Sequence, residues 1–304
     1  MGGKSHDTTG ETYGAFGLRF ASDLALPEVR RATGAADARI MLQRSPEPPP
    51  QDEMWWSIDP AATLTLSLAH LRYTVMAGER IEIVAQQDVP DHEVRVWLLG
   101  RAMSALLLQR GYMVVHANAV ALGDGRAAAM LGDSGDGKST LAAALLAAGV
   151  EPLCDDLLAI RFDEAGDAWV APGIPRIKLG PAAAAVLGID ISNAPEVGGG
   201  MDKRQLALDL DRPWDRTFRL TRLYRLERGE LGIEPLKGRE AAAALLDNLF
   251  WPELQAVMPG QENRFVDAMR LADRCSCFAY RRPFALERLV ESSDSLVRHL
   301  RADV

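Results

Sequence analysis

The stretch Gly132-Asp133-Ser134-Gly135-Asp136-Gly137-Lys138-Ser139, followed by Thr140, decides the fold of this chain. Apolar residues precede it from 127 to 131 and follow it from 141 to 148. That order predicts a strand, a glycine-rich loop and a helix, with the positive end of the helix dipole at the loop. The glycines let successive backbone N–H groups turn toward an anion, and the lysine reaches outer phosphates. The stretch therefore matches the Walker A pattern of a P-loop that binds a nucleoside triphosphate.

Each residue of the loop has an expected part in nucleotide binding. The predicted contacts are Gly132, Asp133, Ser134, Gly135, Asp136, Gly137, Lys138, Ser139 and Thr140. Ser139 is also expected to be a Mg²⁺ ligand, and Lys138 to act on the transferred phosphoryl group. The alternative interpretation is a glycine-rich turn with a surface lysine. The strand, loop and helix in the required order speak against it.

Two adjacent carboxylates, Asp155 and Asp156, come seventeen and eighteen positions after Lys138. They lie in an apolar run, 153–160, that is typical of a strand returning directly from the helix to the loop. Successive strand residues point to opposite faces, so we expect one carboxylate to bind Mg²⁺ and the other to accept the proton of an acceptor hydroxyl. Either carboxylate could take either part. The alternative is a pair of solvated acids at a strand end.

A family resemblance runs from Val115-His116-Ala117-Asn118-Ala119-Val120, through the loop, to Cys154-Asp155-Asp156. In order and spacing these segments resemble the HPr kinase/phosphorylase family, above all its smaller serine-kinase relatives encoded with lasso-peptide biosynthesis genes. The resemblance implies an α/β fold with a P-loop kinase core like that of phosphoenolpyruvate carboxykinase, and phosphorylation of a serine with ATP and Mg²⁺. It also implies that His116 lies beside the phosphates. On physical grounds alone this histidine could equally be a hydrogen-bonded core residue.

Two later basic segments, Pro175-Arg176-Ile177-Lys178-Leu179 and Asp202-Lys203-Arg204, are also similar to the lasso-type kinases. Cations in these segments could neutralise charge on a transferring phosphoryl group. We interpret Lys203 and Arg204 as the better catalytic pair. The alternative is solvated surface charge, because isolated basic residues are common on protein surfaces.

Around this core the chain divides into predicted parts. Residues 1–108 are expected to form a small sheet-rich α+β module, possibly for acceptor recognition, and a helix over 94–109 ended by Gly111 marks its boundary. Residues 109–304 are expected to form the kinase domain, with a helical cap over 238–304. The finer predictions are strands at 63–68, 112–122 and 80–84 and helices at 240–249, 262–273 and 286–300. An exposed loop is predicted at Pro46, Pro48, Pro49 and Pro50, and a mobile loop over 188–203, which contains three consecutive glycines at 198–200.

Composition narrows the class of partner. A net charge of −8 over 304 residues disfavours nucleic acid and anionic lipid. No apolar run is long enough to cross a bilayer, and the first residues lack the hydrophobic core of a signal peptide, so we expect a cytoplasmic protein with no membrane partner. Three cysteines are too few for a disulfide framework. A homo-oligomer is possible.

Three hypotheses about function follow from these residues. The first is an ATP-dependent serine kinase acting on a peptide or small protein, in its most concrete form a ribosomally made, lasso-type precursor peptide. The second is a nucleotide-dependent binding or regulatory protein, and the third is a kinase of a small-molecule hydroxyl compound. The sequence does not distinguish a peptide acceptor from a metabolite acceptor, because acceptor pockets are built by tertiary contacts.

Overall fold

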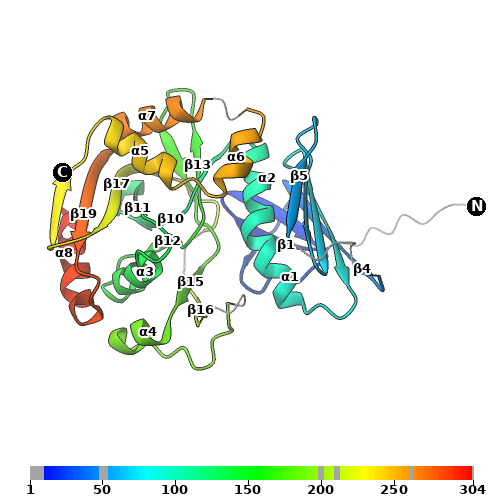
Figure 1. Ribbon diagram of the computed structural model, residues 1–304, viewed down its shortest axis with the longest axis horizontal. Coiled ribbons are helices and arrows are strands. Elements are labelled where there is room, and N and C mark those ends of the chain that lie inside the picture. Colours follow the sequence, from blue (N-terminus) through cyan, green and yellow to red (C-terminus); the bar gives the residue numbers. More distant parts are fainter. Residues whose placement is uncertain (1–9, 48–53, 198–201, 209–212, 261–262, 303–304) are drawn as a thin grey trace, which may run out of the picture.

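The computed structural model describes residues 10–47, 54–197, 202–208, 213–260 and 263–302. The chain is a mixed α/β protein with two large sheets (Figure 1). Most of the predicted proline loop, and residues 198–201 of the predicted mobile loop, lie outside the described residues.

The N-terminal part is an eight-stranded mixed sheet in the order β3-β1-β2-β4-β8-β7-β6-β5. Buried and partly exposed residues alternate along its strands, as expected when one face packs on a core and the other meets solvent. The two predicted strands, 63–68 and 80–84, are confirmed. The strands are β1 (Glu11–Ala15), β2 (Leu18–Ser22), β3 (Arg30–Arg31), β4 (Ala38–Ser45), β5 (Trp55–Ile58), β6 (Leu64–Leu68), β7 (Leu71–Met76) and β8 (Arg80–Gln86).

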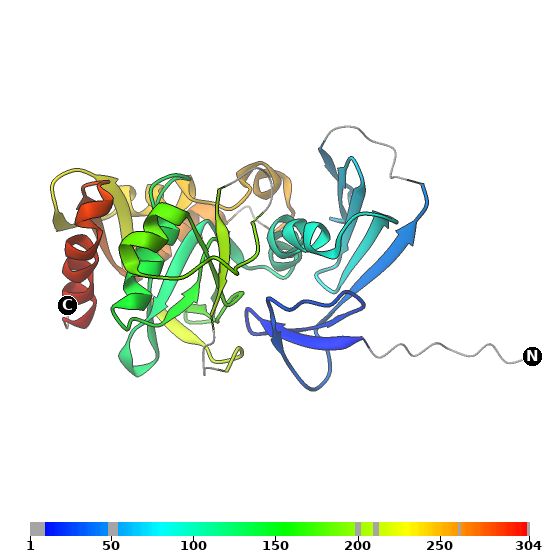
Figure 2. The same cartoon turned by 90° about the horizontal axis from the view of Figure 1, so that it is seen from below.

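The helix predicted over 94–109 is present and covers this sheet. It consists of α1 (Asp91–Trp97), a π-helical segment η1 (Leu98–Ala102) and α2 (Met103–Gln109), and it ends at Gly111 with a φ of 80°. Tyr73 of β7 donates a hydrogen bond of 2.8 Å to the Val94 carbonyl, which joins helix and sheet. In two perpendicular views the helix lies between the N-terminal sheet and the rest of the chain (Figures 1 and 2).

Replacing Leu106 with alanine should lower the free energy of unfolding by about 2–5 kcal/mol, because it leaves a cavity in this core. Leu106 lies in α2 and is completely buried. Urea denaturation would measure the loss. Leu286→Ala is the matched control, because Leu286 is 36% exposed. Equal losses in the two variants would contradict the packing described here.

The second sheet follows the strand order β12-β10-β11-β17-β14-β13-β9, and β19 joins it through β17 and pairs in turn with β18. β11 runs parallel to β17, and β17 runs parallel to β19. The strands are β9 (Met113–Val115), β10 (Ala117–Ala121), β11 (Arg126–Leu131), β12 (Pro152–Cys154), β13 (Leu158–Phe162), β14 (Ala168–Val170), β17 (Phe218–Arg228), β18 (Gly232–Pro235) and β19 (Ser276–Arg282). A separate hairpin is formed by β15 (Arg176–Leu179) and β16 (Arg204–Ala207).

Helices cover both faces of the second sheet. Along β11, Ala127 and Ala129 belong to the core beneath α5 and α7, whereas Ala128 and Met130 belong to the core beneath α3 and α8. Because both faces are buried, the strand reads as a continuous apolar run in the sequence. The helices are α3 (Lys138–Ala147), α4 (Pro181–Leu187), α5 (Arg239–Asp247), α6 (Pro252–Val257), α7 (Arg264–Arg274) and α8 (Leu289–Arg301), with short 3-10 turns η2 (Gly123–Gly125) and η3 (Leu286–Arg288).

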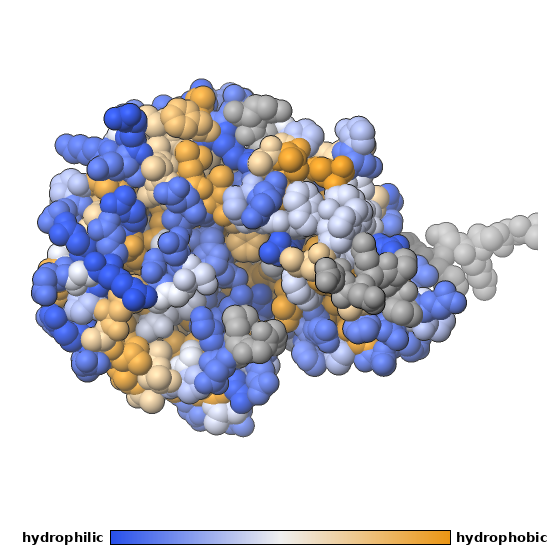
Figure 3. All heavy atoms as spheres, viewed as in Figure 1, coloured by the Kyte–Doolittle hydropathy of each residue, from blue (hydrophilic) through white to orange (hydrophobic). Residues whose placement is uncertain are grey.

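The region 238–304 is only partly the helical cap that the sequence predicted. Its three predicted helices correspond to α5, α7 and α8, but β19 lies among them and runs within the second sheet beside β17. None of the helices in the described part of the chain is long and apolar enough to cross a membrane. Hydrophilic residues cover most of the face seen in Figure 3.

Candidate functional site

The glycine-rich loop connects β11 to α3, in the order that the sequence predicted. Gly135 and Gly137 have φ angles of 97° and 71°, which side chains with a Cβ rarely adopt. Residues 133–135 are exposed at the tip of the loop, and Ser139 and Thr140 are half-buried in the first turn of the helix. The Asp136 carboxylate accepts a hydrogen bond of 2.7 Å from the Asp133 N–H, which ties the tip together.

Two side chains from distant segments hold this loop. Asn248, just beyond α5, accepts a hydrogen bond of 2.8 Å from the Gly132 N–H through its Oδ1. Arg282, at the end of β19, donates hydrogen bonds of 2.7 Å to the Asp136 carbonyl and 3.3 Å to the Gly137 carbonyl. A Cβ at Gly137 would lie 2.8 Å from the Arg282 guanidinium, so only glycine allows this approach. The side chains of Asn248 and Arg282 therefore hold the loop through hydrogen bonds to its backbone groups.

Lys138 opens α3 with its side chain turned back along the loop. Its Nζ donates to the carbonyls of Gly132 and Asp133, and the residue is only 6% exposed. Burial lowers the pKa of Lys138, while the nearby Asp156 and Asp136 carboxylates act in the opposite direction. The buried Asn118 of β10 holds the start of the helix, because its Nδ2 donates a 2.6 Å hydrogen bond to the Lys138 carbonyl.

Asp155 and Asp156 lie in a bend between β12 and β13, so the single strand predicted over 153–160 is wrong. β12 pairs with β10, whereas β13 pairs with β9, and the chain has to turn where it changes partner. Asp156 has a φ of 86° there. The strand predicted over 112–122 breaks opposite this bend, at His116, whose N–H donates to the Asn248 carbonyl at 2.7 Å. These two breaks open the sheet beside the loop.

Asp155 is half-buried and faces the start of α3. Its Oδ2 accepts a 3.0 Å hydrogen bond from the Lys178 backbone N–H, while its Oδ1 is buried without a hydrogen-bond partner among the described residues. Burial raises the pKa of this carboxyl above its usual value. Hydrogen bonds from the Lys178 N–H and the Ser139 hydroxyl act in the opposite direction but do not cancel the effect of burial. A buried carboxylate oxygen without a partner, beside a serine hydroxyl, fits a divalent cation.

These oxygen donors suit Mg²⁺, which binds to proteins through one or two carboxylates together with water and substrate phosphates. The described residues contain no cluster of three or more histidine, cysteine or acidic side chains that would form a complete metal cage. Ser139 and Asp155 would thus hold the ion together with phosphate oxygens.

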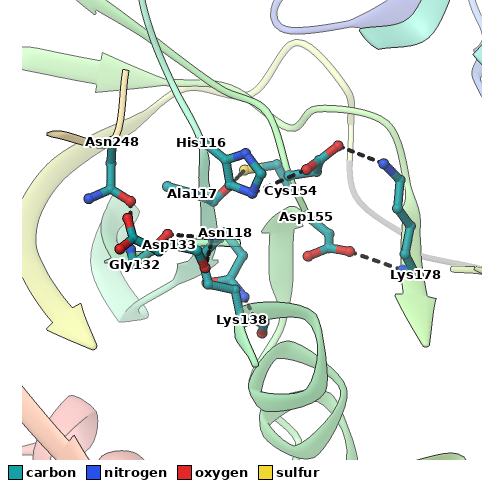
Figure 4. A network of polar contacts seen from close by, with 11 residues as sticks. His116, Ala117, Asn118, Gly132, Asp133, Lys138, Cys154, Asp155, Lys178 and Asn248 are labelled. Carbon is teal, nitrogen blue, oxygen red and sulfur yellow. Dashed lines mark hydrogen bonds and ion pairs between the residues drawn. The ribbon is translucent and has the colours of Figure 1, made fainter. Parts of the chain in front are cut away.

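Asp156 contacts a different set of side chains, His116 and Lys178, both of which are labelled in Figure 4. Its Oδ2 lies 2.7 Å from Lys178 Nζ, and its Oδ1 lies 3.4 Å from His116 Nε2. Burial acts to raise the pKa of Asp156, but the charge and hydrogen bond of Lys178, together with His116 when it is protonated, outweigh it and the pKa is lowered. Asp156 is therefore held ionised beside the loop.

His116 is stacked on Phe250, with ring centroids 6.1 Å apart. Burial lowers its pKa, more than the Asp156 carboxylate raises it, so the imidazole is neutral at neutral pH. The structure thus brings His116, Lys138, Asp155 and Asp156 together, as the sequence predicted.

The basic residues are arranged differently from the prediction. Lys178 of β15 supplies the cation at the acid pair, whereas Arg204 forms an ion pair with Glu196 at 3.2 Å. In the β15–β16 hairpin Arg204 pairs with Leu179, the residue after Lys178. Because neighbouring residues of a strand point to opposite faces, Arg204 projects from the face opposite to that of Lys178. Lys203 acts on the site through its charge, which helps to lower the pKa of His116.

Comparison with known proteins finds matches among the solved structures. No protein-family profile matches the chain, and no curated protein matches it in sequence. The solved structures that it matches include the HPr(Ser) kinase/phosphatase from Coxiella burnetii, with 14% sequence identity and a TM-score of 0.31. That match covers 62% of this chain and 95% of the other. A likeness at this level of identity assigns no role to any individual residue of this chain.

Proposed function

We propose that this protein is an ATP-dependent kinase that transfers the γ-phosphoryl group to a serine hydroxyl. One observation carries the proposal: the loop at the start of α3, with Lys138 buried in it, lies beside a bend that carries two half-buried carboxylates of different character. The helix N-terminus and loop amides favour phosphate groups. A carboxylate that is held ionised beside that position can accept a proton from a hydroxyl.

The two carboxylates suit different tasks. Asp155, with its free oxygen beside Ser139, is the proposed Mg²⁺ ligand. Bound Mg²⁺ would neutralise charge on the phosphate oxygens. Asp156, which is kept ionised by Lys178, is the proposed base. As the acceptor oxygen bonds to the γ-phosphorus, the bond from that phosphorus to the bridging oxygen of ADP breaks, and the hydroxyl proton passes to Asp156.

Lys138 and Lys178 are the proposed cations of the reaction. Lys138 can leave the loop carbonyls for the outer phosphates when nucleotide arrives. Lys178 lies on the Asp156 side, where it can balance negative charge as the phosphoryl group moves. The neutral His116 would help to orient Asp156. Lys203 is close enough to add positive potential, whereas Arg204 contributes less because Glu196 neutralises it.

The acceptor that we favour is a peptide or small protein, and in its narrowest form a lasso-type precursor peptide. The ground for it is the resemblance of the segments around His116, the loop and the acid pair to the smaller HPr-kinase-like serine kinases. Incubation with γ-labelled ATP, Mg²⁺ and parallel sets of serine peptides and small hydroxyl compounds tests it. Label on a peptide serine supports the proposal. Label only on small compounds points to a metabolite kinase, and tight ATP binding without transfer points to a regulatory protein.

Replacing Arg282 with glutamine should weaken ATP binding by about 10- to 100-fold, the range expected for the loss of a hydrogen bond from a charged group. The reason is indirect: without the guanidinium, the carbonyls of Asp136 and Gly137 lose their donor and the loop amides lose their orientation. Isothermal titration calorimetry would measure the change. Arg282→Lys should recover part of it.

Arg281→Gln is the matched control for Arg282, because the neighbouring Arg281 is half-exposed and pairs with Glu227 and Glu234 away from the loop. It should bind ATP as the parent protein does. Unchanged ATP affinity in a folded Arg282→Gln protein would show that this arginine does not position the loop.

A further inference from the structure

A cleft opens between the β15–β16 hairpin on one side and helix α1 with the β2–β3 connection on the other. Its volume is about 600 Å³, within the usual range of ligand sites. One wall carries Glu28, His92 and Arg95, and the other carries Arg176 and Gln205. Pro27, Pro175 and Pro195 also line it, and their fixed backbone angles favour a preformed shape.

The cleft is longer than a single compact pocket. A second cavity of about 390 Å³ shares Pro27, Glu28, Pro175 and Ala207 with it. Arg30 and Arg31 line that second cavity. Two adjoining cavities along one seam suit a chain-like ligand better than a compact metabolite.

Arg176 connects this cleft to the acid pair. It lines the cleft, and it is two residues before Lys178 on the same face of β15. Its charge is near enough to act on Asp155 and Asp156. A ligand that touches Arg176 and extends along β15 as far as Lys178 would reach the proposed base, which pairs with Lys178.

Among the described residues the guanidinium of Arg176 forms no ion pair, although the carboxylates of Glu28, Asp156 and Asp155 are near enough to act on its charge. Arg176 is only 9% exposed, and its one side-chain hydrogen bond among the described residues is 2.9 Å long and goes to the neutral Gln205. Burying a cation without an ion-pair partner is costly, so a ligand that supplies an anion gains affinity. The other charges of the cleft are already balanced: Arg95 pairs with Glu28 at 2.7 Å, and Arg204 at the rim pairs with Glu196.

We propose that this cleft binds the acceptor as an extended acidic peptide, with a carboxylate side chain of the peptide on Arg176 and its serine hydroxyl at Asp156. A planar guanidinium matches a carboxylate through two parallel hydrogen bonds. This inference rests on the proposed kinase function and adds the class of acceptor. Arg176 becomes a residue that determines specificity.

The experiment uses short serine peptides with both termini blocked, so that side chains supply every carboxylate. One aspartate is moved through the positions near the serine, and each peptide is compared with its asparagine counterpart. With the parent protein, at least one aspartate position should raise kcat/KM by about tenfold or more, mostly through KM. Arg176→Gln should remove this ratio, and Arg176→Lys should restore part of it.

Controls separate this inference from the proposed function. Arg298→Gln, at an exposed position of α8, should keep the parent ratio. The KM for ATP should not change in Arg176→Gln, because the loop does not contact this side chain. Equal use of aspartate and asparagine peptides by the parent, or a preference retained by Arg176→Gln, would overturn the acidic-peptide inference alone. Transfer to none of the peptides would contradict the peptide-kinase function itself.

Discussion

Replacing Asp156 with asparagine should reduce phosphoryl transfer by about 10²- to 10⁴-fold, the usual contribution of a general base. Asparagine keeps the shape of the side chain but cannot accept the acceptor proton. ATP binding should survive, because Asp156 contacts Lys178 and His116 rather than the loop. Single-turnover transfer and calorimetric ATP binding, measured on the same sample, check both expectations.

Asp294→Asn is the control for this substitution, since Asp294 is exposed on α8. It should transfer as the parent does. Undiminished transfer by Asp156→Asn would remove Asp156 as the base. If Asp155→Asn then lost transfer while retaining Mg²⁺-dependent ATP binding, the two carboxylates would have exchanged roles.

Replacing Lys138 with alanine should lower kcat/KM for ATP by about 10²- to 10³-fold or more, as expected when a preorganised donor to developing charge is lost. Lys138 is the cation buried within the loop itself. Steady-state transfer of label at varied ATP concentration measures the effect. Circular dichroism should show that the fold survives, because the residue opens α3 rather than filling a core.

Lys237→Ala is the control for Lys138, because Lys237 is exposed and lies in the turn between β18 and α5. It should leave transfer unchanged. Normal transfer by Lys138→Ala would contradict the assignment of the loop as a phosphate site, and with it the proposed function.

The local parts of the site could be predicted from sequence because their signals are local. β11, the loop and α3 follow from an apolar run, three glycines and a second apolar run within about two dozen residues. The sheet-rich N-terminal part and the helix ended by Gly111 followed from periodicity and a cap in the same way. Each of these elements is specified by its own neighbours in the chain.

The side chains that complete the site could not be predicted in this way. Asn248 and Arg282 reach the loop across 116 and 146 positions of sequence, and no local pattern marks either one. The segment that contains Lys178 was recognised, but only the register of the β15–β16 hairpin shows that Lys178, and not Arg204, faces the acid pair. The bend at Asp155 and Asp156 likewise depends on strand pairing, because β12 pairs with β10 whereas β13 pairs with β9.

Hydrogen exchange of the backbone amides, with and without Mg²⁺ and ATP, tests the central claim most directly. The claim is that the nucleotide lies on the loop at the start of α3, beside the acid pair. We expect ATP to slow exchange across residues 132–140 and, to a smaller extent, at 155–156, and we expect this protection to disappear in Lys138→Ala. ATP binding that protects another part of the chain and leaves residues 132–140 unchanged would contradict the account.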